Sequence, residues 1–246
     1  MFEVGAERYD RFMGRYSVPL ALEFADFAGV ERGQRALDVG CGPGALTSEL
    51  VRRLGADSVA AVDPSEPFVA AARERHPGVD VELAPAERLP FADDSFDAAL
   101  AQLVVQFMSD PAAGAREMAR VTRARGVVAV CVWDHGTGRG PLSLYWRAAG
   151  GRGESGNFGT NEGELGRLLR EAGLADVEET LLSVTVEHVG FEDWWEPYTY
   201  GVGPVGVHYA RLDPERQAEQ RERARLLFEE AGPALTVSAW AARGRA

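Results

Sequence analysis

The sequence contains no lysine and no isoleucine, so its whole basic charge is carried by arginine. The absence of lysine excludes any reaction that proceeds through a lysine Schiff base or a lysine general base. The chain has only two cysteines, Cys41 and Cys131, which form neither a disulfide framework nor the spacing of a zinc site. Both lie in apolar, strand-like surroundings, so we expect them to be reduced and buried.

Membrane and nucleic-acid signals are also missing. No apolar run approaches the length that crosses a bilayer, and the opening MFEVGAERYDRF lacks the pattern of a signal peptide. The net charge of −12 repels phosphate backbones, although the same charge also serves simply to keep a protein soluble. We therefore expect a cytoplasmic protein without nucleic-acid or membrane partners, and the oligomeric state stays open.

The 246 residues suit one α/β domain with insertions better than two full domains. Short apolar segments alternate with helical ones through the first half, which predicts βαβ units and a mostly parallel sheet. A first helix is expected to open at Ser17-Val18-Pro19 and to run to about Val30. The expected strands are 36–39, 58–62, 79–83, 96–101, 126–133, 177–187 and 235–242, and the later helices are 45–54, 64–75, 110–122, 142–149, 162–172 and 214–230.

A glycine-rich loop, Gly40-Cys41-Gly42-Pro43-Gly44, joins the first strand to the following helix. Glycines at such a turn let the backbone approach a ligand closely, and the helix behind them offers free N–H groups. About twenty residues later, Asp63 ends the next strand, where a carboxylate can accept both hydroxyls of a ribose. The alternative is a tight connection without a ligand, but strand, helix and spaced acid together favour a nucleotide-like cofactor.

Two ligand classes compete for this loop. Gly40, Gly42 and Ala45 also fit the G-x-G-x-x-G/A fingerprint, so a nicotinamide-dinucleotide oxidoreductase is one alternative. Asp38, beside the loop, would repel a pyrophosphate and suit a cationic ammonium or sulfonium group. Pro43 also removes an N–H that could have bound phosphate. The balance favours a cationic ligand.

Three motifs carry a family resemblance. LDVGCGPG, AVDPSEPFV and AERLPFADDSFDAAL resemble the first three motifs of class I S-adenosylmethionine-dependent methyltransferases, in the type 11 group related to ubiquinone and menaquinone biosynthesis enzymes. YDRFMGRYS is similar to a bacterial subgroup of these proteins. The resemblance, which extends from about Tyr9 to Trp133, implies S-adenosylmethionine as cofactor and S-adenosylhomocysteine as product. It also implies a Rossmann-like α/β fold whose seven-stranded, mostly parallel sheet ends in an antiparallel strand.

The resemblance assigns a role to each matching position. Two positions depart from it: Pro85 stands where the family often has an acid that meets the adenine amino group, and Gln106-Phe107 stand where it often has a histidine. The matching residues are Asp38, Gly40, Cys41, Gly42 and Gly44 for the amino-acid part of the cofactor, Asp63 for the ribose, Pro64, Ser65, Ala86 and Glu87 around the adenine, and Gln102 near the methionine portion.

The N-terminal segment is expected to cover the cofactor through Tyr9, Arg15 and Tyr16, with Arg15 pairing with the cofactor carboxylate. The alternative is a docking helix with ordinary aromatic anchors. Among the four histidines, His135 follows the fifth strand at the end where parallel sheets bind ligands, and it is the candidate general base. The alternative is a loop histidine, while His76 is expected to be a surface or capping residue. No metal site is expected.

An aromatic segment precedes the last strand. Its side chains could form a lid that presents aromatic faces to an apolar acceptor, or could simply pack against the sheet. We expect one domain over 1–246, divided into an N-terminal helical cap (1–33), a cofactor-binding core (34–134) and substrate-side insertions (135–160 and 188–233). The expected function is methyl transfer to a small apolar or aromatic molecule, and a non-methylating S-adenosylmethionine-binding protein is a further alternative. The candidate substrate residues are Trp146, Trp194, Trp195, Tyr198 and His208.

Overall fold

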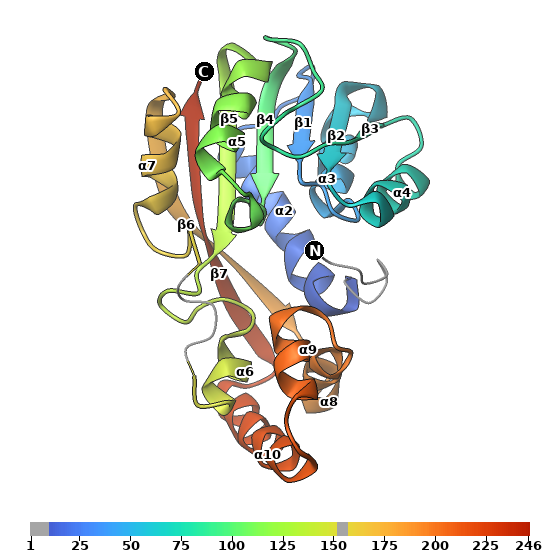
Figure 1. Ribbon diagram of the computed structural model, residues 1–246, viewed down its shortest axis with the longest axis vertical. Helices are drawn as coiled ribbons and strands as arrows, with labels where there is room; N and C mark the ends of the chain where they lie inside the picture. The colour runs from blue at the N-terminus through green and yellow to red at the C-terminus, as the bar shows by residue number, and fades with distance from the viewer. Residues whose placement is uncertain (1–9, 152–156) are drawn as a thin grey trace.

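The computed structural model describes residues 10–151 and 157–246 (Figure 1). Its centre is a seven-stranded sheet with the order β3-β2-β1-β4-β5-β7-β6. Strands β1 to β5 pair in parallel, and β7 runs antiparallel to both β5 and β6. The predicted Rossmann-like sheet with an antiparallel last strand is therefore confirmed. The strands are β1 (Ala36–Val39), β2 (Val59–Asp63), β3 (Asp80–Leu83), β4 (Phe96–Gln102), β5 (Thr122–Trp133), β6 (Ala175–Glu187) and β7 (Ala234–Arg245).

Two apolar layers cover the faces of this sheet. Every residue of β1, β2 and β4 is buried, as expected for central parallel strands covered on both sides. Helices α2 (Arg15–Ala28) and α3 (Ala45–Leu54) contribute to one layer, and α5 (Pro111–Val121) and α7 (Glu164–Glu171) contribute to the other. Successive strand residues belong to different layers, Ala36 to the first and Leu37 to the second. Both cysteines are free and buried, as predicted.

The first helix begins earlier than the sequence pattern indicated. A π-helical turn, Asp10–Gly14, leads directly into α2, and Pro19 lies inside the helix rather than near its first residue. Proline removes one helical hydrogen bond. Tyr16, Leu20 and Phe24, spaced four residues apart, are buried on one face, and this burial compensates for the lost bond.

The segment between β6 and β7 packs with α6 (Ser143–Ala148) into a helical group at the far end of these long strands (Figure 1). It contains α8 (Phe191–Trp195), α9 (Gly203–Ala210) and α10 (Pro214–Ala231). Although α10 is highly charged, Gln220, Ala224 and Phe228 are buried along one side. Within residues 10–151 and 157–246, no helix is both long and apolar enough to cross a membrane.

The burial of α2 yields a stability prediction. Phe24 is 0% exposed whereas Leu22, on the same helix, is 42% exposed. We expect Phe24→Ala to lower the free energy of unfolding by about 3–5 kcal/mol, because a cavity replaces the ring. The control Leu22→Ala is expected to cost less than about 1 kcal/mol. Urea denaturation followed by tryptophan fluorescence measures both, and equal losses would contradict this packing.

Candidate functional site

The glycine loop, residues 40–44, joins β1 to α3 at the carboxyl ends of the parallel strands. Gly40, Gly42 and Gly44 all have positive φ, at 71°, 54° and 99°, a conformation that L side chains rarely adopt. A Cβ on Gly40 would in addition lie 2.5 Å from both methyl carbons of Val104. The path of the loop therefore depends on glycine at these positions.

The N–H groups of the loop are already used inside the protein. They donate to the Val62 and Cys41 carbonyls and to the Asp63 carboxylate, and Pro43 has no N–H. A pyrophosphate would need several of these donors, so the loop disfavours a dinucleotide. The bonds run from Gly40 and Cys41 to Val62 O at 2.8 and 2.9 Å, from Gly44 to Cys41 O at 3.0 Å, and from Gly42 to Asp63 Oδ2 at 2.8 Å.

Two buried carboxylates stand beside the loop. Asp38, in β1, is 1% exposed and accepts a hydrogen bond from Thr47 Oγ1 at 2.7 Å. Burial, and to a lesser extent the nearby Asp63, raises the pKa of Asp38 to about 7 despite that bond. Burial also raises the pKa of Asp63, although Asp63 accepts N–H bonds from Gly42 and Ser65. Removal of the carboxylates from water thus favours a cationic ligand beside them.

A cavity of about 390 Å³ opens in front of these groups. Among the described residues its wall contains the two carboxylates and no cationic side chain. Gln102 donates through Nε2 to the Ser17 carbonyl at 3.0 Å, while its buried Oε1 has no hydrogen-bond partner within residues 10–151 and 157–246. The cavity therefore offers acceptors to a ligand that brings donors. Its wall consists of Gly14, Ser17, Asp38, Gly40, Cys41, Gly42, Pro43, Ala45, Leu46, Asp63, Pro64, Ser65, Phe68, Gln102, Leu103, Val104 and Phe107.

Most residues assigned to the cofactor by the family motifs share this wall. Gly44 is the exception within the loop, because it lies behind the wall against His76. Tyr9 lies outside the described residues. The assigned residues that the structure brings together are Asp38, Gly40, Cys41, Gly42, Asp63, Pro64, Ser65 and Gln102.

Arg15 and Tyr16 do not line the cavity, which differs from the sequence expectation. The Arg15 guanidinium donates to the backbone and side-chain oxygens of Asp193, and its Nη1 lies 2.9 Å from His188 Nδ1. The Tyr16 hydroxyl lies 3.2 Å from His188 Nε2. On a helix, residues three apart share a face, and here Gly14 and Ser17 face the cavity.

Ala86 and Glu87 are also absent from the wall. The Glu87 carboxylate accepts bonds from the N–H and hydroxyl of Ser109 at 2.7 and 2.8 Å, and from the N–H of Asp110 at 3.2 Å. Ala86 is buried beneath α5. A Cβ added to Gly114 of that helix would lie 3.6 Å from the Cβ of Ala86. The Glu87 side chain is thus directed toward the start of α5 rather than toward an adenine.

His135 and Trp146 line a second hollow of about 540 Å³, separate from the wall of the first cavity. His135 is 8% exposed, and burial lowers its pKa to about 4, so the imidazole is neutral at pH 7. The N–H of the preceding Asp134 donates to Ser238 O at 2.9 Å, which ties this turn to β7. The structure therefore does not bring the expected base to the cavity.

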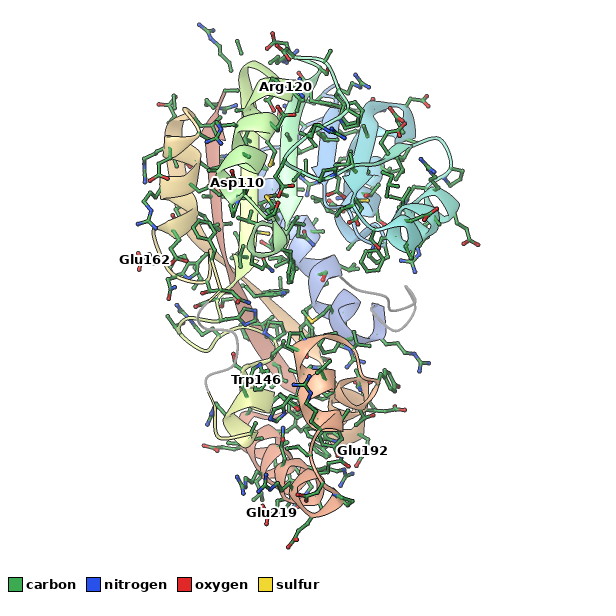
Figure 2. The ribbon with its side chains drawn as sticks, viewed as in Figure 1. Asp110, Arg120, Trp146, Glu162, Glu192 and Glu219 are labelled. Carbon is green, nitrogen blue, oxygen red and sulfur yellow. The ribbon has the colours of Figure 1, made fainter. Side chains whose placement is uncertain are left out.

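The aromatic insertion is a packed core rather than an open lid. Trp194, Trp195 and Tyr198 are 1–2% exposed and contact one another and Tyr145. His208 lies with Nδ1 2.8 Å from the Tyr145 hydroxyl. None of these four candidate substrate residues lines the cavity. Figure 2 shows Trp146 on α6, at the level of this helical group.

Sequence reasoning missed several residues of the wall. Phe68 carries a readable signal, since it lies in the first turn of the helix that follows Asp63. Leu103 carries none: its backbone is left-handed, with φ 63°, and its N–H donates to the Cys131 carbonyl at 2.8 Å. Phe107, 61% exposed, lies on the wall near solvent. The other missed residues are Gly14, Ser17, Pro43, Ala45, Leu46 and Val104.

The raised pKa of Asp38 yields a pH prediction. Its folded-state pKa of about 7 lies above the ordinary 3.8, so its contribution to stability is full below pH ~4 and is lost as the pH rises through about 7. Asp38→Asn stays neutral and retains an acceptor for Thr47. We expect this variant to exceed the unaltered protein in free energy of unfolding at about pH 8, on the order of a few kcal/mol.

Urea denaturation between about pH 5 and pH 8 measures this effect, and the gap should shrink as the pH falls. Asp134 is an opposite-sign control, because hydrogen bonds from Thr137 and Arg139 outweigh its burial and lower its pKa. Because its lowered pKa keeps Asp134 ionised throughout this range, Asp134→Asn should lose stability by the same amount at each pH. A gap for Asp38→Asn that does not change with pH would contradict the account.

The sequence around the site is similar to that of known proteins. A family profile described as a methyltransferase domain matches residues 37–130. A demethylmenaquinone methyltransferase of Mycobacterium sp. (strain KMS) is 37% identical over 156 residues, which cover 59% of this chain and 63% of the relative. A malonyl-[acyl-carrier protein] O-methyltransferase of Erwinia billingiae is 36% identical over 127 residues, covering 52% and 49%. The chain thus spans less than two thirds of these curated relatives.

A solved structure shares the fold. Haemonchus contortus phosphoethanolamine N-methyltransferase 2, in complex with S-adenosylhomocysteine, has a TM-score of 0.60 and 18% identity, covering 98% of this chain and 56% of that one. The profile match contains Asp38, the glycine loop and Asp63. Residues 37–130 therefore resemble a methyltransferase domain in sequence, and the chain shares the fold of this solved structure.

Proposed function

We propose that this protein binds S-adenosylmethionine in the 390 Å³ cavity and transfers its methyl group to a small molecule. The observation that carries the proposal is the polarity of the wall. Asp38, Asp63 and the unpartnered Oε1 of Gln102 are all acceptors, and no cationic side chain accompanies them among the described lining residues. S-adenosylmethionine brings an ammonium, a sulfonium and ribose hydroxyls, which are the cations and donors that such a wall satisfies.

Each acceptor has a distinct task. Asp63 keeps free lone pairs after accepting the Gly42 and Ser65 N–H groups, and it would accept the ribose hydroxyls. Gln102 Oε1 would accept from the ammonium, with its orientation fixed by the bond from Nε2 to Ser17 O. Asp38 adds a buried negative charge once a cation stabilises its ionised form. When bound, the cofactor supplies a methyl group on a good leaving group.

The chain's residues then contribute alignment and exclusion of water more than proton transfer. Because His135 lies off the cavity wall, we assign it no step. Leu103 and Phe107 give the wall an apolar side, which suits a small apolar or aromatic acceptor. The names of the relatives agree with this class in part, since one methylates demethylmenaquinone and another a malonyl group on a carrier protein.

Asp63 gives the direct test of the site. We expect Asp63→Asn to weaken S-adenosylhomocysteine binding at least tenfold, because a charged acceptor for the ribose hydroxyls is lost. Asp97→Asn is the matched control: Asp97 is also a buried carboxylate that accepts a backbone N–H, from Arg35 at 2.6 Å, but at the opposite end of the sheet. Isothermal titration calorimetry measures both dissociation constants.

Two results would contradict the proposal. Equal affinity of Asp63→Asn and Asp97→Asn would remove the ribose assignment. The protein could also bind S-adenosylmethionine yet release no S-adenosylhomocysteine with any apolar or aromatic acceptor. That result would show a binding protein that does not methylate.

A further inference from the structure

We propose that the carboxyl-terminal end of α4 (Glu66–Arg75) braces the glycine loop from behind, with Arg75 and His76 as positioning residues for the cofactor. This role in cofactor binding rests on the proposed function. Neither residue lines the cavity, so both would act through the loop rather than on the ligand. The family motifs assign no task to this end of the helix.

Arg75 is hydrogen-bonded to the backbone of the glycine loop. Its Nη1 donates to the Pro43 carbonyl at 2.9 Å. Proline has no N–H, so the carbonyl is the only backbone group through which this residue can be held. Pro43 itself lies on the cavity wall. The bond therefore connects the exposed end of α4 to a residue that would touch the cofactor.

His76 supports the next residue of the loop. A Cβ on Gly44 would lie 2.7 Å from His76 Nε2, so the imidazole packs directly against the glycine. Nε2 also lies 3.2 Å from Ser48 Oγ, which donates to the Gly44 carbonyl at 2.8 Å. Burial and the Arg75 charge lower the pKa of His76, so it is neutral at pH 7. The sequence indicated only a surface or capping role.

The two ends of α4 thereby fix two parts of one site. At its start, the N–H of Ser65 donates to Asp63 Oδ1 at 2.8 Å. At its finish, Arg75 and His76 contact Pro43 and Gly44. A loop with three glycines is conformationally free unless held, and a loop ordered before binding costs the ligand less to organise. The ten residues of α4 thus link Asp63 to the loop a second time, in addition to the direct bond from the Gly42 N–H to Asp63.

Arg73 offers a matched control on the same helix. Its guanidinium also clasps a backbone carbonyl, that of Val81, through Nε at 2.9 Å and Nη2 at 2.5 Å. Val81 belongs to β3 rather than to the loop. Arg73→Ala and Arg75→Ala thus remove similar contacts with different targets. His76→Ala and His76→Gln form a second pair, in which glutamine retains a side-chain donor near Ser48.

Hydrogen–deuterium exchange of the ligand-free protein tests the brace without assuming any ligand. In Arg75→Ala and His76→Ala we expect the amides of residues 40–48 to exchange about five- to tenfold faster, since local opening becomes easier. Arg73→Ala should leave these amides unchanged, and His76→Gln should restore most of the protection. Equal exchange of this segment in all variants would overturn the inference, whatever the ligand proves to be.

Titration with S-adenosylhomocysteine then tests the consequence for binding. We expect Arg75→Ala to raise the dissociation constant about five- to tenfold and Arg73→Ala to leave it unchanged, with similar melting temperatures for the two variants. Equal dissociation constants would refute the positioning role. Failure of the unaltered protein to bind would overturn the proposed function and the cofactor role together, while faster loop exchange would still support the brace itself.

Discussion

The structure depends on two carboxylates held out of water at the ends of adjacent parallel strands. Asp38 is the last but one residue of β1 and Asp63 is the last residue of β2, both beside the glycine loop, and burial raises the pKa of both. A protein built for stability alone would place neutral groups there. The sheet tolerates the pair because Thr47 and two backbone N–H groups solvate it. The ligand that relieves this cost is cationic, which connects the energetics of the fold to its proposed cofactor.

Other elements contact the two acids and the cavity, some directly and some through the N-terminal helix. Nearby, α3 supplies Thr47 and α4 connects Asp63 to the far side of the loop. Farther away, the N-terminal helix joins the cavity to the helical group at the end of β6 and β7. Ser17 accepts the bond that orients Gln102, while Arg15 binds Asp193. One helix thus has a face toward the cavity and a face toward the aromatic core.

Local patterns were sufficient for the sheet and for the two acids of the cavity wall. Alternation of short apolar runs and helices located the strands, and the spacing from Asp38 to Asp63 identified the acids that share the cavity. Such features depend on residues close together in sequence or on a common strand end. The orientation of Arg15 depends instead on Asp193, 178 residues away, which no local pattern reveals.

The aromatic insertion shows a second limit of sequence reasoning. Tryptophans and tyrosines at helical spacing form either a lid or a core, and only the tertiary packing of Trp194 beside Phe228 distinguishes them. Leu103 shows a third limit, because a left-handed backbone at a leucine has no signal in the local sequence. Long-range contacts, rather than local propensity, thus determine how the aromatic insertion packs.

The most direct test of the central claim is a calorimetric comparison of two ligands on the unaltered protein. One is S-adenosylmethionine, a cation, and the other is reduced nicotinamide dinucleotide, which carries a pyrophosphate. The acidic wall and the occupied N–H groups of the loop predict one-to-one binding of the first and no binding of the second. Binding of the dinucleotide with no heat from S-adenosylmethionine would contradict the account at its foundation.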